Sequence, residues 1–295
     1  MGFSVLIIGC GDIGTALGRE LIDEGHSVIG VRRHVEALEG SGIKPLALDL
    51  DHLDEGDAKA LPQADYVIYT VSADHFEEGA YQSAYPQGLK RVLSVLERQE
   101  TPPKRVFFVS STSVYGQQEG ETVNEQSPTD ASGFSGVLMC QAEQALINHR
   151  LPGSVVRFSG IYGPGRDRLI RQVAEGRVAA VTPVMYSNRI HRDDCAGILK
   201  HLMYCDQQGQ ALEDIYLGSD CEPAALHDVM TWIAKQLKVE ATETVQSPLR
   251  RRASKRCDSS RVVNSGYTFR YPSFREGYQQ VLKEGGFLDA SPSTS

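Results

Sequence analysis

Residues 3–33 constrain the fold of this chain most strongly, because apolar runs and glycines alternate there in a fixed order. An apolar run at 5–8 is followed by a glycine-rich turn, and apolar residues with helical spacing then continue to Gly25. A second apolar run occupies 28–31. Strand, glycine turn, helix and strand in this order predict a βαβ unit with parallel strands.

The glycine turn itself predicts a dinucleotide site. Gly9 permits a tight turn, Gly11 lets the backbone approach a pyrophosphate, and Gly14 lets helix and strand pack closely. The phosphates would lie at the positive N-terminus of the helix. We therefore expect the whole turn to contact the cofactor, namely Gly9, Cys10, Gly11, Asp12, Ile13 and Gly14.

Two arginines at the end of the second strand indicate which dinucleotide binds. An acidic residue at this place would hold a ribose 2′-hydroxyl, whereas arginine suits a 2′-phosphate. The chain has Arg32 and Arg33 there, and no acidic residue before Glu36. We predict NADP(H) in preference to NAD(H), and a solvated basic loop edge is the alternative interpretation.

The composition excludes several classes of protein. The 295 residues are 41% hydrophobic and 23% charged, as in ordinary globular proteins, and the net charge of −8 argues against a nucleic-acid partner. No apolar run approaches the ~20 residues that a membrane-spanning helix needs. The first residues also lack the features of a signal peptide. We therefore expect no membrane partner and a cytoplasmic location.

The six cysteines have no zinc-like spacing, so we expect no metal site. Cys10 lies within the glycine turn, where helix amides would lower the pKa of a thiol. The other interpretation, which we prefer, is that a small side chain simply fits there.

Further apolar runs predict the rest of an α/β fold. We expect strands at 43–50, 64–71, 105–110 and 154–158, and helices at 85–98 and 136–148. This alternation predicts a doubly wound parallel sheet, whose ligands lie at the carboxyl ends of the strands. Ser72 and the segment 110–115 would then lie beside the cofactor. The polar segment 119–132 is typical of a surface loop.

Beyond residue 165 the alternation of strands and helices weakens. Helical patterns at 168–175, 193–204 and 225–237 are interrupted by short runs, of which 214–217 is the clearest strand. We expect a dinucleotide-binding domain at 1–165, with a return to its sheet near 211–219. Residues 166–295 would form a smaller, substrate-binding lobe.

Several motifs occur in a characteristic order along the chain, namely GCGDIG at 9–14, SSTSVYG at 110–116, GIYGPGR at 160–166, IHRDD at 190–194 and KRCDSSR at 255–261. In these motifs the chain resembles the extended short-chain dehydrogenases/reductases, the NAD-dependent epimerase/dehydratase family. The resemblance covers nearly the whole chain and implies a Rossmann fold with a smaller C-terminal lobe. It also implies that Asp49 and Leu50 flank the adenine, and that Thr70, Val71 and Ser72 face the nicotinamide-side ribose.

The family's catalytic pair is missing from this chain. Members carry Tyr-x-x-x-Lys on one helix, in which lysine lowers the pKa of the tyrosine, and a serine at a nearby strand end assists. Ser111 matches that serine, and Glu143 matches a glutamate that ends the helical motif. Counting back places Ser135 at the tyrosine position and Met139 at the lysine position, and residues 131–147 contain neither Tyr nor Lys. This loss is similar to that in the YeeZ-like branch of the superfamily.

Other residues are candidates for catalysis or substrate binding. Tyr115 is either a substitute acid or base or part of the strand-end turn, and Tyr162 is open to the same two interpretations. His191 titrates near neutral pH, but anchoring by hydrogen bonds is the favoured role. Asp193 and Asp194 would cap a helix that starts near residue 195.

An arginine-rich run at 249–256 is the densest positive segment of the chain. Arginine forks bind phosphates well, so Arg252 is a candidate substrate ligand, and Arg166 is a second one. A solvated loop is the alternative interpretation of the run.

Two functions follow from these observations. The first is an NADP(H)-dependent oxidoreductase or epimerase-like enzyme with a non-standard active site, acting on a polar small molecule of the phosphorylated or nucleotide-linked class. The second is a catalytically silent dinucleotide sensor. The residues favour the enzyme slightly, and the resemblance allows pairing of two copies as a homodimer.

Overall fold

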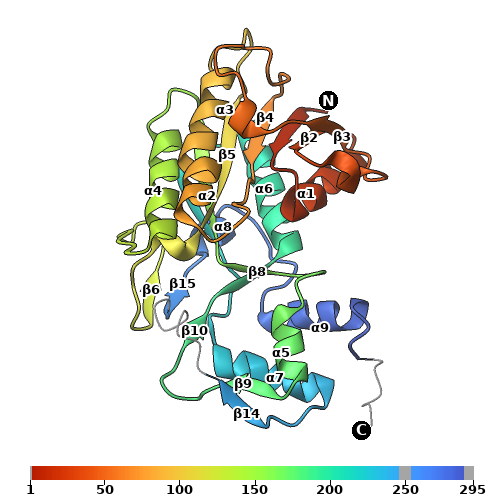
Figure 1. Cartoon of the computed structure of the whole chain (residues 1–295), viewed down its shortest axis with the longest axis vertical. Coiled ribbons are helices and arrows are strands. Elements are labelled where there is room, and N and C mark those ends of the chain that lie inside the picture. The colour runs from red at the N-terminus through yellow and green to blue at the C-terminus, as the bar shows by residue number, and fades with distance from the viewer. Residues whose placement is uncertain (1, 246–253, 289–295) are drawn as a thin grey trace. The chain divides into compact units, whose positions relative to one another are not determined.

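A seven-stranded parallel sheet organises the protein (Figure 1). The structure is a computed structural model that describes residues 2–245 and 254–288. The strand order is β12-β7-β5-β4-β1-β2-β3. The strands are β1 (Ser4–Ile8), β2 (Ser27–Arg32), β3 (Lys44–Ala47), β4 (Tyr66–Tyr69), β5 (Arg105–Ser111), β7 (Gly153–Phe158) and β12 (Ile215–Gly218).

The order of the strands reverses at β1, as in a doubly wound fold. The chain moves outward from β1 through β2 to β3, then returns to β4 and β5 on the other side of β1. Because such crossovers are right-handed, helices cover both faces of the sheet. The predicted fold class is therefore confirmed. The main helices are α1 (Asp12–Asp23), α3 (Gly88–Leu96), α4 (Phe134–Ile147) and α6 (Arg192–Gln207).

The predicted helix at 85–98 begins earlier and contains an irregular turn. Here α2 (Glu78–Gln82) leads into a π-helical turn, η3 (Ser83–Gln87), before α3 starts. Pro86 lies inside that turn. Proline has no N–H to donate, so a regular ladder of hydrogen bonds cannot pass through it.

The chain forms two compact units that are not separated by a single boundary. One unit contains residues 1–115, 129–157 and 195–216, and the other contains 116–128, 158–194 and 217–295. We call these the sheet unit and the second unit. The segment 195–216, which includes most of α6, therefore groups with the sheet unit.

The second unit consists of short strands and helices around its own core. Its strands are β6 (Glu121–Val123), β8 (Gly160–Tyr162), β9 (Arg177–Ala179), β10 (Tyr186–Ser187), β11 (Arg189–His191), β13 (Ala224–Ala225), β14 (Glu243–Val245) and β15 (Lys255–Cys257). Its helices are α5 (Arg168–Ala174), α7 (Leu226–Leu237), α8 (Ser260–Asn264) and α9 (Phe274–Glu284). Side chains of α5, α7 and α9 form the core.

The expectation of a plain surface loop at 119–132 was wrong in one respect. Strand β6 lies within it and pairs in parallel with β15, with Val123 opposite Cys257. Val123 is buried in this short ladder. A three-residue strand with a distant partner leaves no local pattern, which explains why the polar sequence suggested only a loop.

A buried polar network joins β5, α4 and β7 within the sheet unit. Arg157 donates two hydrogen bonds to Glu143, at 2.9 and 2.6 Å, and a third to the Tyr115 hydroxyl at 3.0 Å. The Ser110 hydroxyl donates to Glu143 at 2.5 Å. Both charged side chains are almost fully buried, at 3% and 2% exposed. Such a pair is stable only while both partners are present.

We predict that Glu143→Leu lowers the free energy of unfolding by about 3 kcal/mol or more, because it leaves the Arg157 charge buried without its partner. The double variant Glu143→Leu/Arg157→Met should recover more than half of this loss. Urea denaturation followed by circular dichroism measures both. Equal stability of the single variant and the wild type would contradict the role given to this pair.

Candidate functional site

The glycine turn between β1 and α1 has the geometry of a phosphate-binding loop. Gly9 has φ +78°, and a Cβ atom there would lie 2.6 Å from the Val71 backbone. At Gly14 a Cβ would lie 2.8 Å from Ile7 Cγ2. A Cβ at Gly11 would meet only the Gly9 carbonyl oxygen, at 3.7 Å. The fold therefore requires glycine at 9 and 14, whereas Gly11 leaves space open beside the helix.

The N-terminus of α1 is suited to an anion. Gly11 is the N-cap residue, and it makes no side-chain hydrogen bond to the first turn. First-turn amides have no acceptor within their own helix, and the helix dipole makes this end positive. Space without a Cβ next to such amides fits a pyrophosphate group.

Neighbouring strand ends hold the turn in place. The Thr70 hydroxyl donates to the Gly9 carbonyl at 2.8 Å, and the amides of Gly9 and Cys10 both donate to the Val31 carbonyl at 3.0 Å. Arg32 Nη1 donates to the Cys10 carbonyl at 3.3 Å. The structure thus brings together predicted site residues from β1, β2 and β4, and the Thr70 hydroxyl is used to support the turn.

Cys10 is buried, and burial raises the pKa of its thiol to about 11. A lowered pKa is therefore wrong for this thiol, because desolvation outweighs the hydrogen bond with Thr15 and the charge of Arg32. The interpretation of Cys10 as a small residue that fits the turn agrees with its burial.

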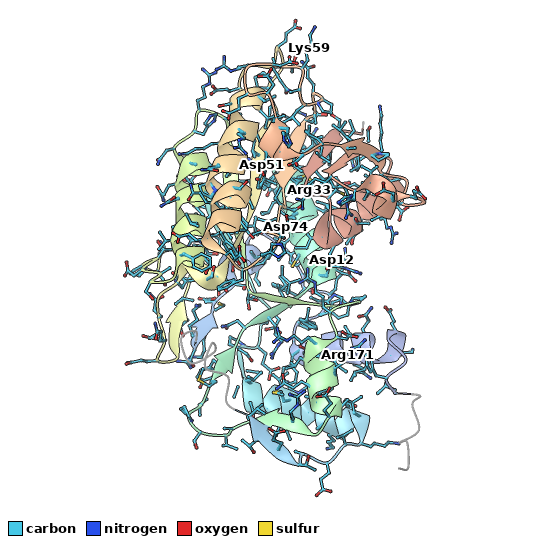
Figure 2. All side chains as sticks on the ribbon, in the orientation of Figure 1. Asp12, Arg33, Asp51, Lys59, Asp74 and Arg171 are labelled. Atoms are coloured by element: carbon cyan, nitrogen blue, oxygen red, sulfur yellow. The ribbon has the colours of Figure 1, made fainter. Side chains whose placement is uncertain are left out.

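The remaining candidate cofactor residues lie on the loops after β2, β3 and β4. Arg33 Nη2 pairs with Asp74 Oδ1 at 2.5 Å, and both side chains are about half exposed. Figure 2 labels both residues. Asp49 accepts a hydrogen bond from the Asp51 amide and caps the short 3₁₀ helix η2 (Leu50–His52). Leu50 is half-buried, and Ser72 is exposed.

The helix that carries the family's catalytic pair is present without it. Ser135 lies in the first turn of α4, and Met139 is buried one turn later. Gly136 packs this turn against the carbonyl of Ser113, in the 3₁₀ helix η4 (Thr112–Val114) after β5. The two segments that would flank a reacting substrate in the sheet unit therefore adjoin each other.

Ser111 and Tyr115 lie in different environments. Ser111 ends β5 and is half-buried, and its Oγ accepts a hydrogen bond from the Ser113 amide at 3.1 Å. This leaves the hydroxyl proton of Ser111 for another acceptor. Tyr115 is 3% exposed, and its hydroxyl accepts a hydrogen bond from Arg157. The geometry of Tyr115 fits an anchor of the strand-end turn better than an acid or base.

His191 is fully buried in the second unit. Its Nδ1 accepts a hydrogen bond from the Asp193 amide at 3.2 Å, so the ring proton lies on Nε2, which donates to Gln280 Oε1 at 3.1 Å. Burial lowers the pKa of His191 below its ordinary value. Both ring nitrogens are occupied, as the anchoring role requires.

Asp194 does not cap a helix, contrary to expectation. Helix α6 begins earlier, at Arg192, and Asp194 is buried in its first turn. Its carboxylate instead accepts hydrogen bonds from the Tyr267 hydroxyl and from the amides of Arg270 and Tyr271, at 2.7, 2.8 and 3.0 Å. Asp194 therefore fixes the segment 267–271.

Tyr162 is packed in the core of the second unit, stacked on Tyr278 with ring centroids 4.5 Å apart. Burial raises the pKa of its hydroxyl well above the ordinary value, which makes the group a poor acid or base at neutral pH. Arg166 is exposed ahead of α5. Arg252, with most of the arginine-rich run, lies outside the described residues.

The sequence did not suggest a further buried group beside Tyr162. The Tyr162 hydroxyl, Arg189 Nη1 and Asp220 Oδ2 are buried without a hydrogen-bond partner among the described residues. Burial raises the pKa of Asp220 to about 8. A single Asp between short apolar runs carries no sequence signal of such burial.

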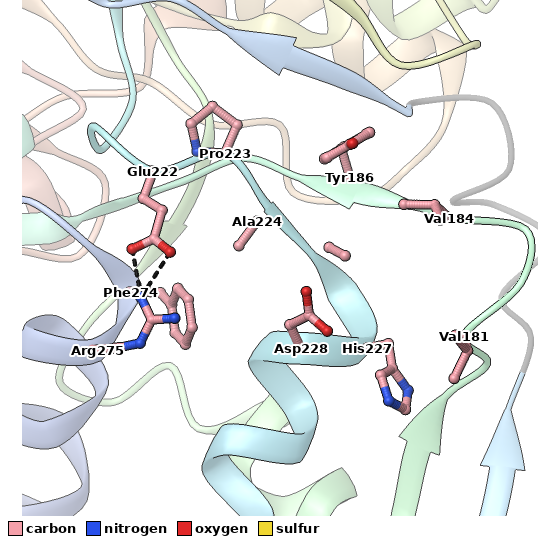
Figure 3. Close-up of a pocket in the computed structure, with 11 residues that line it drawn as sticks. Val181, Val184, Tyr186, Glu222, Pro223, Ala224, His227, Asp228, Phe274 and Arg275 are labelled. Atoms are coloured by element: carbon pink, nitrogen blue, oxygen red, sulfur yellow. Dashed lines mark hydrogen bonds and ion pairs between the residues drawn. The ribbon is translucent and has the colours of Figure 1, made fainter.

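The second unit also contains a cavity of about 330 Å³ (Figure 3). Apolar side chains of Val181, Val184 and Phe274 line it, together with Asp228 and the Glu222–Arg275 ion pair. None of Tyr162, Arg166 and His191 lines it. The described residues contain no cluster of His, Cys, Asp and Glu that could hold a metal ion, and none of their helices has the length and apolar composition to cross a bilayer.

Comparison with known proteins agrees with this geometry. Residues 5–203 match the NAD dependent epimerase/dehydratase family. The chain belongs to this family. The match includes the glycine turn, Arg32 and Arg33, and the helix α4 that lacks the tyrosine and lysine.

Members and fold neighbours cover almost the whole chain. Protein YeeZ of Escherichia coli strain K12 is 29% identical in an alignment of 284 positions, which covers 91% of this chain and 96% of YeeZ. The structure of a presumed NAD-dependent epimerase/dehydratase from Methylobacillus flagellatus is 33% identical, with a TM-score of 0.79 over 97% of this chain and 100% of that one.

A second structure shares the fold alone. MoeE5 in complex with UDP-glucose and NAD is 21% identical, with a TM-score of 0.81 over 97% of this chain and 100% of MoeE5.

Two glycine variants should separate folding from cofactor binding. Gly14→Ala forces a Cβ against Ile7, so we expect a loss of about 1–3 kcal/mol of stability. Gly11→Ala has space in the fold, so its melting temperature should change by only a few degrees, while NADPH affinity falls at least tenfold because the Cβ occupies the place of the pyrophosphate. Thermal unfolding and isothermal titration calorimetry measure these effects. Unchanged NADPH affinity of Gly11→Ala would contradict the placement of the phosphates.

Proposed function

We propose that this family member is an NADP(H)-dependent oxidoreductase or epimerase-like enzyme that acts on a polar small molecule of the phosphorylated or nucleotide-linked class. The observation that carries the proposal is the glycine turn at the N-terminus of α1, with two arginines at the end of β2. These features supply an anion site for a pyrophosphate and guanidinium groups for a 2′-phosphate.

The charges after β2 support NADP(H). Arg33 is half exposed and pairs at the surface with Asp74, whereas the half-buried Arg32 reaches across to the carbonyl of Cys10. Guanidinium groups bind phosphate with paired, charge-assisted hydrogen bonds. The acidic residue that would hold a 2′-hydroxyl is missing at this place in the sequence.

Ser111 is our candidate for the group that polarises the substrate. When bound, the nicotinamide supplies or accepts a hydride at C4. The Ser111 Oγ accepts a hydrogen bond from the Ser113 amide. The hydroxyl proton of Ser111 can therefore be donated to a substrate oxygen. Tyr115 is engaged by Arg157, so it does not replace the missing tyrosine. We assign to Ser135, in the first turn of α4, the holding of a water or a substrate hydroxyl rather than the movement of a proton.

The substrate class rests on charge and on fold likeness. Arg166 and Arg168 are exposed at the start of α5 and suit a phosphate. The likeness to MoeE5, whose structure contains UDP-glucose, supports a nucleotide-linked compound as the first class to test.

A dinucleotide sensor without catalysis is the second candidate. It is favoured by Met139, an apolar side chain buried at the lysine position. Lysine there would lower the pKa of a catalytic tyrosine, and neither residue is required for binding the nucleotide.

Titration of the purified chain with NADPH and NADH tests the proposal. We expect at least tenfold tighter binding of NADPH, and a loss of most of this preference in Arg33→Ser, since a charge-assisted hydrogen bond contributes about 1.5–3 kcal/mol. Tighter binding of NADH would contradict the NADP(H) assignment.

A second measurement separates the enzyme from the sensor. NADPH oxidation is followed with a panel of nucleotide sugars and simple carbonyl compounds, and Ser111→Ala should lower kcat at least tenfold with NADPH affinity unchanged. NADPH binding without turnover on any panel member, together with a cofactor-dependent change in affinity for a protein partner, would favour the sensor.

A further inference from the structure

We propose that Asp74 weakens the preference of this site for the 2′-phosphate by competing for Arg33. The inference rests on the proposed function, because it takes Arg33 as the ligand of the 2′ group. It adds a specificity-determining carboxylate that comes from a different strand end. Neutralising Asp74 should therefore strengthen the selectivity for NADP(H).

The two residues meet across the edge of the sheet where the nucleotide would bind. Arg33 follows β2 and Asp74 follows β4, and these strands flank β1 on its two sides. Arg33 Nη2 lies 2.5 Å from Asp74 Oδ1, although the residues are 41 positions apart in the chain. Figure 2 labels both side chains, which lie next to each other.

The pair is open to solvent and can exchange partners. The side chains of Arg33 and Asp74 are 52% and 50% exposed. Exposed ion pairs of this kind contribute little to stability, typically ~0–1 kcal/mol. A bound phosphate can thus take Arg33 from Asp74 without disturbing the fold.

Neighbouring carboxylates also stabilise the charged form of Arg33. The hydrogen bond and charge of Asp74 raise the pKa of Arg33, and Asp49 and Asp51 add smaller contributions. Arg33 in turn lowers the pKa of Asp74, so this carboxylate is ionised at neutral pH. A 2′-phosphate therefore has to displace an ionised competitor, whereas a 2′-hydroxyl does not need Arg33 and leaves the pair intact.

The variant Asp74→Asn tests the inference, because it keeps the shape of the side chain and removes the charge. Glu222→Gln is the matched control, since Glu222 pairs with Arg275 at similar exposures of 42% and 46% in the second unit. Dissociation constants are measured by calorimetry on the full chain for NADPH and NADH, and for 2′,5′-ADP and 5′-ADP as probes of the 2′-phosphate alone.

We expect Asp74→Asn to tighten binding of NADPH and 2′,5′-ADP by about three- to fivefold, the upper part of the range for one exposed charge interaction. Binding of NADH and 5′-ADP should stay within about twofold, and Glu222→Gln should change none of the four. An unchanged NADPH-to-NADH ratio in Asp74→Asn, or weaker NADPH binding, would overturn the inference.

A double variant tests whether Asp74 acts through Arg33. In an Arg33→Ala background, Asp74→Asn should change the NADPH-to-NADH ratio less than twofold. A shift as large as in the wild-type background would overturn the proposed competition.

The outcomes separate this inference from the proposed function. A wild-type chain that prefers NADH defeats the NADP(H) assignment, yet a shift of the ratio in Asp74→Asn still supports Asp74 as a selectivity residue. A wild-type chain that prefers NADPH, with no shift in Asp74→Asn, defeats this inference alone.

Discussion

The close packing of Gly9 against the Val71 backbone is the contact on which the nucleotide site depends. It holds the turn after β1 directly against the segment that follows β4, at a distance that no side chain at position 9 would allow. The Thr70 hydroxyl then binds the Gly9 carbonyl, and Gly14 brings α1 down onto Ile7 of β1. Together these contacts fix the position of the first turn of α1 at the carboxyl end of β1. A pyrophosphate there can accept hydrogen bonds from the amides of that turn.

Electrostatics near this point are more balanced than the sequence suggests. Arg32 and Arg33 place positive charge at the end of β2, while Asp74 follows β4, on the other side of β1, and pairs with Arg33. In our proposal, selectivity for the cofactor is a difference between two competing interactions rather than the property of one arginine. The polar network around Glu143 and Arg157 lies in the same unit and fixes Tyr115, so it belongs to the scaffold.

The local sequence pattern was sufficient for the Rossmann unit, because buried parallel strands and a glycine turn have strong short-range signals. The absence of tyrosine and lysine from α4 could also be seen directly in the sequence. Long-range contacts could not be predicted in this way. Nothing near Arg33 indicates that Asp74 pairs with it, and the β6–β15 ladder joins segments that look like loops when taken alone. His191 illustrates an intermediate case, since its residue type allowed two roles and only its burial and two hydrogen bonds distinguish them.

Hydrogen–deuterium exchange of the full chain with and without saturating NADPH tests the central claim most directly. First-turn amides of α1 have no acceptor in their own helix and should exchange readily until phosphate oxygens accept their protons. The account predicts slower exchange at Gly9–Gly14, Arg32–Arg33 and Thr70–Ser72 when NADPH is bound. Unchanged exchange at these three segments, or protection confined to the residues that line the cavity of the second unit, would contradict it.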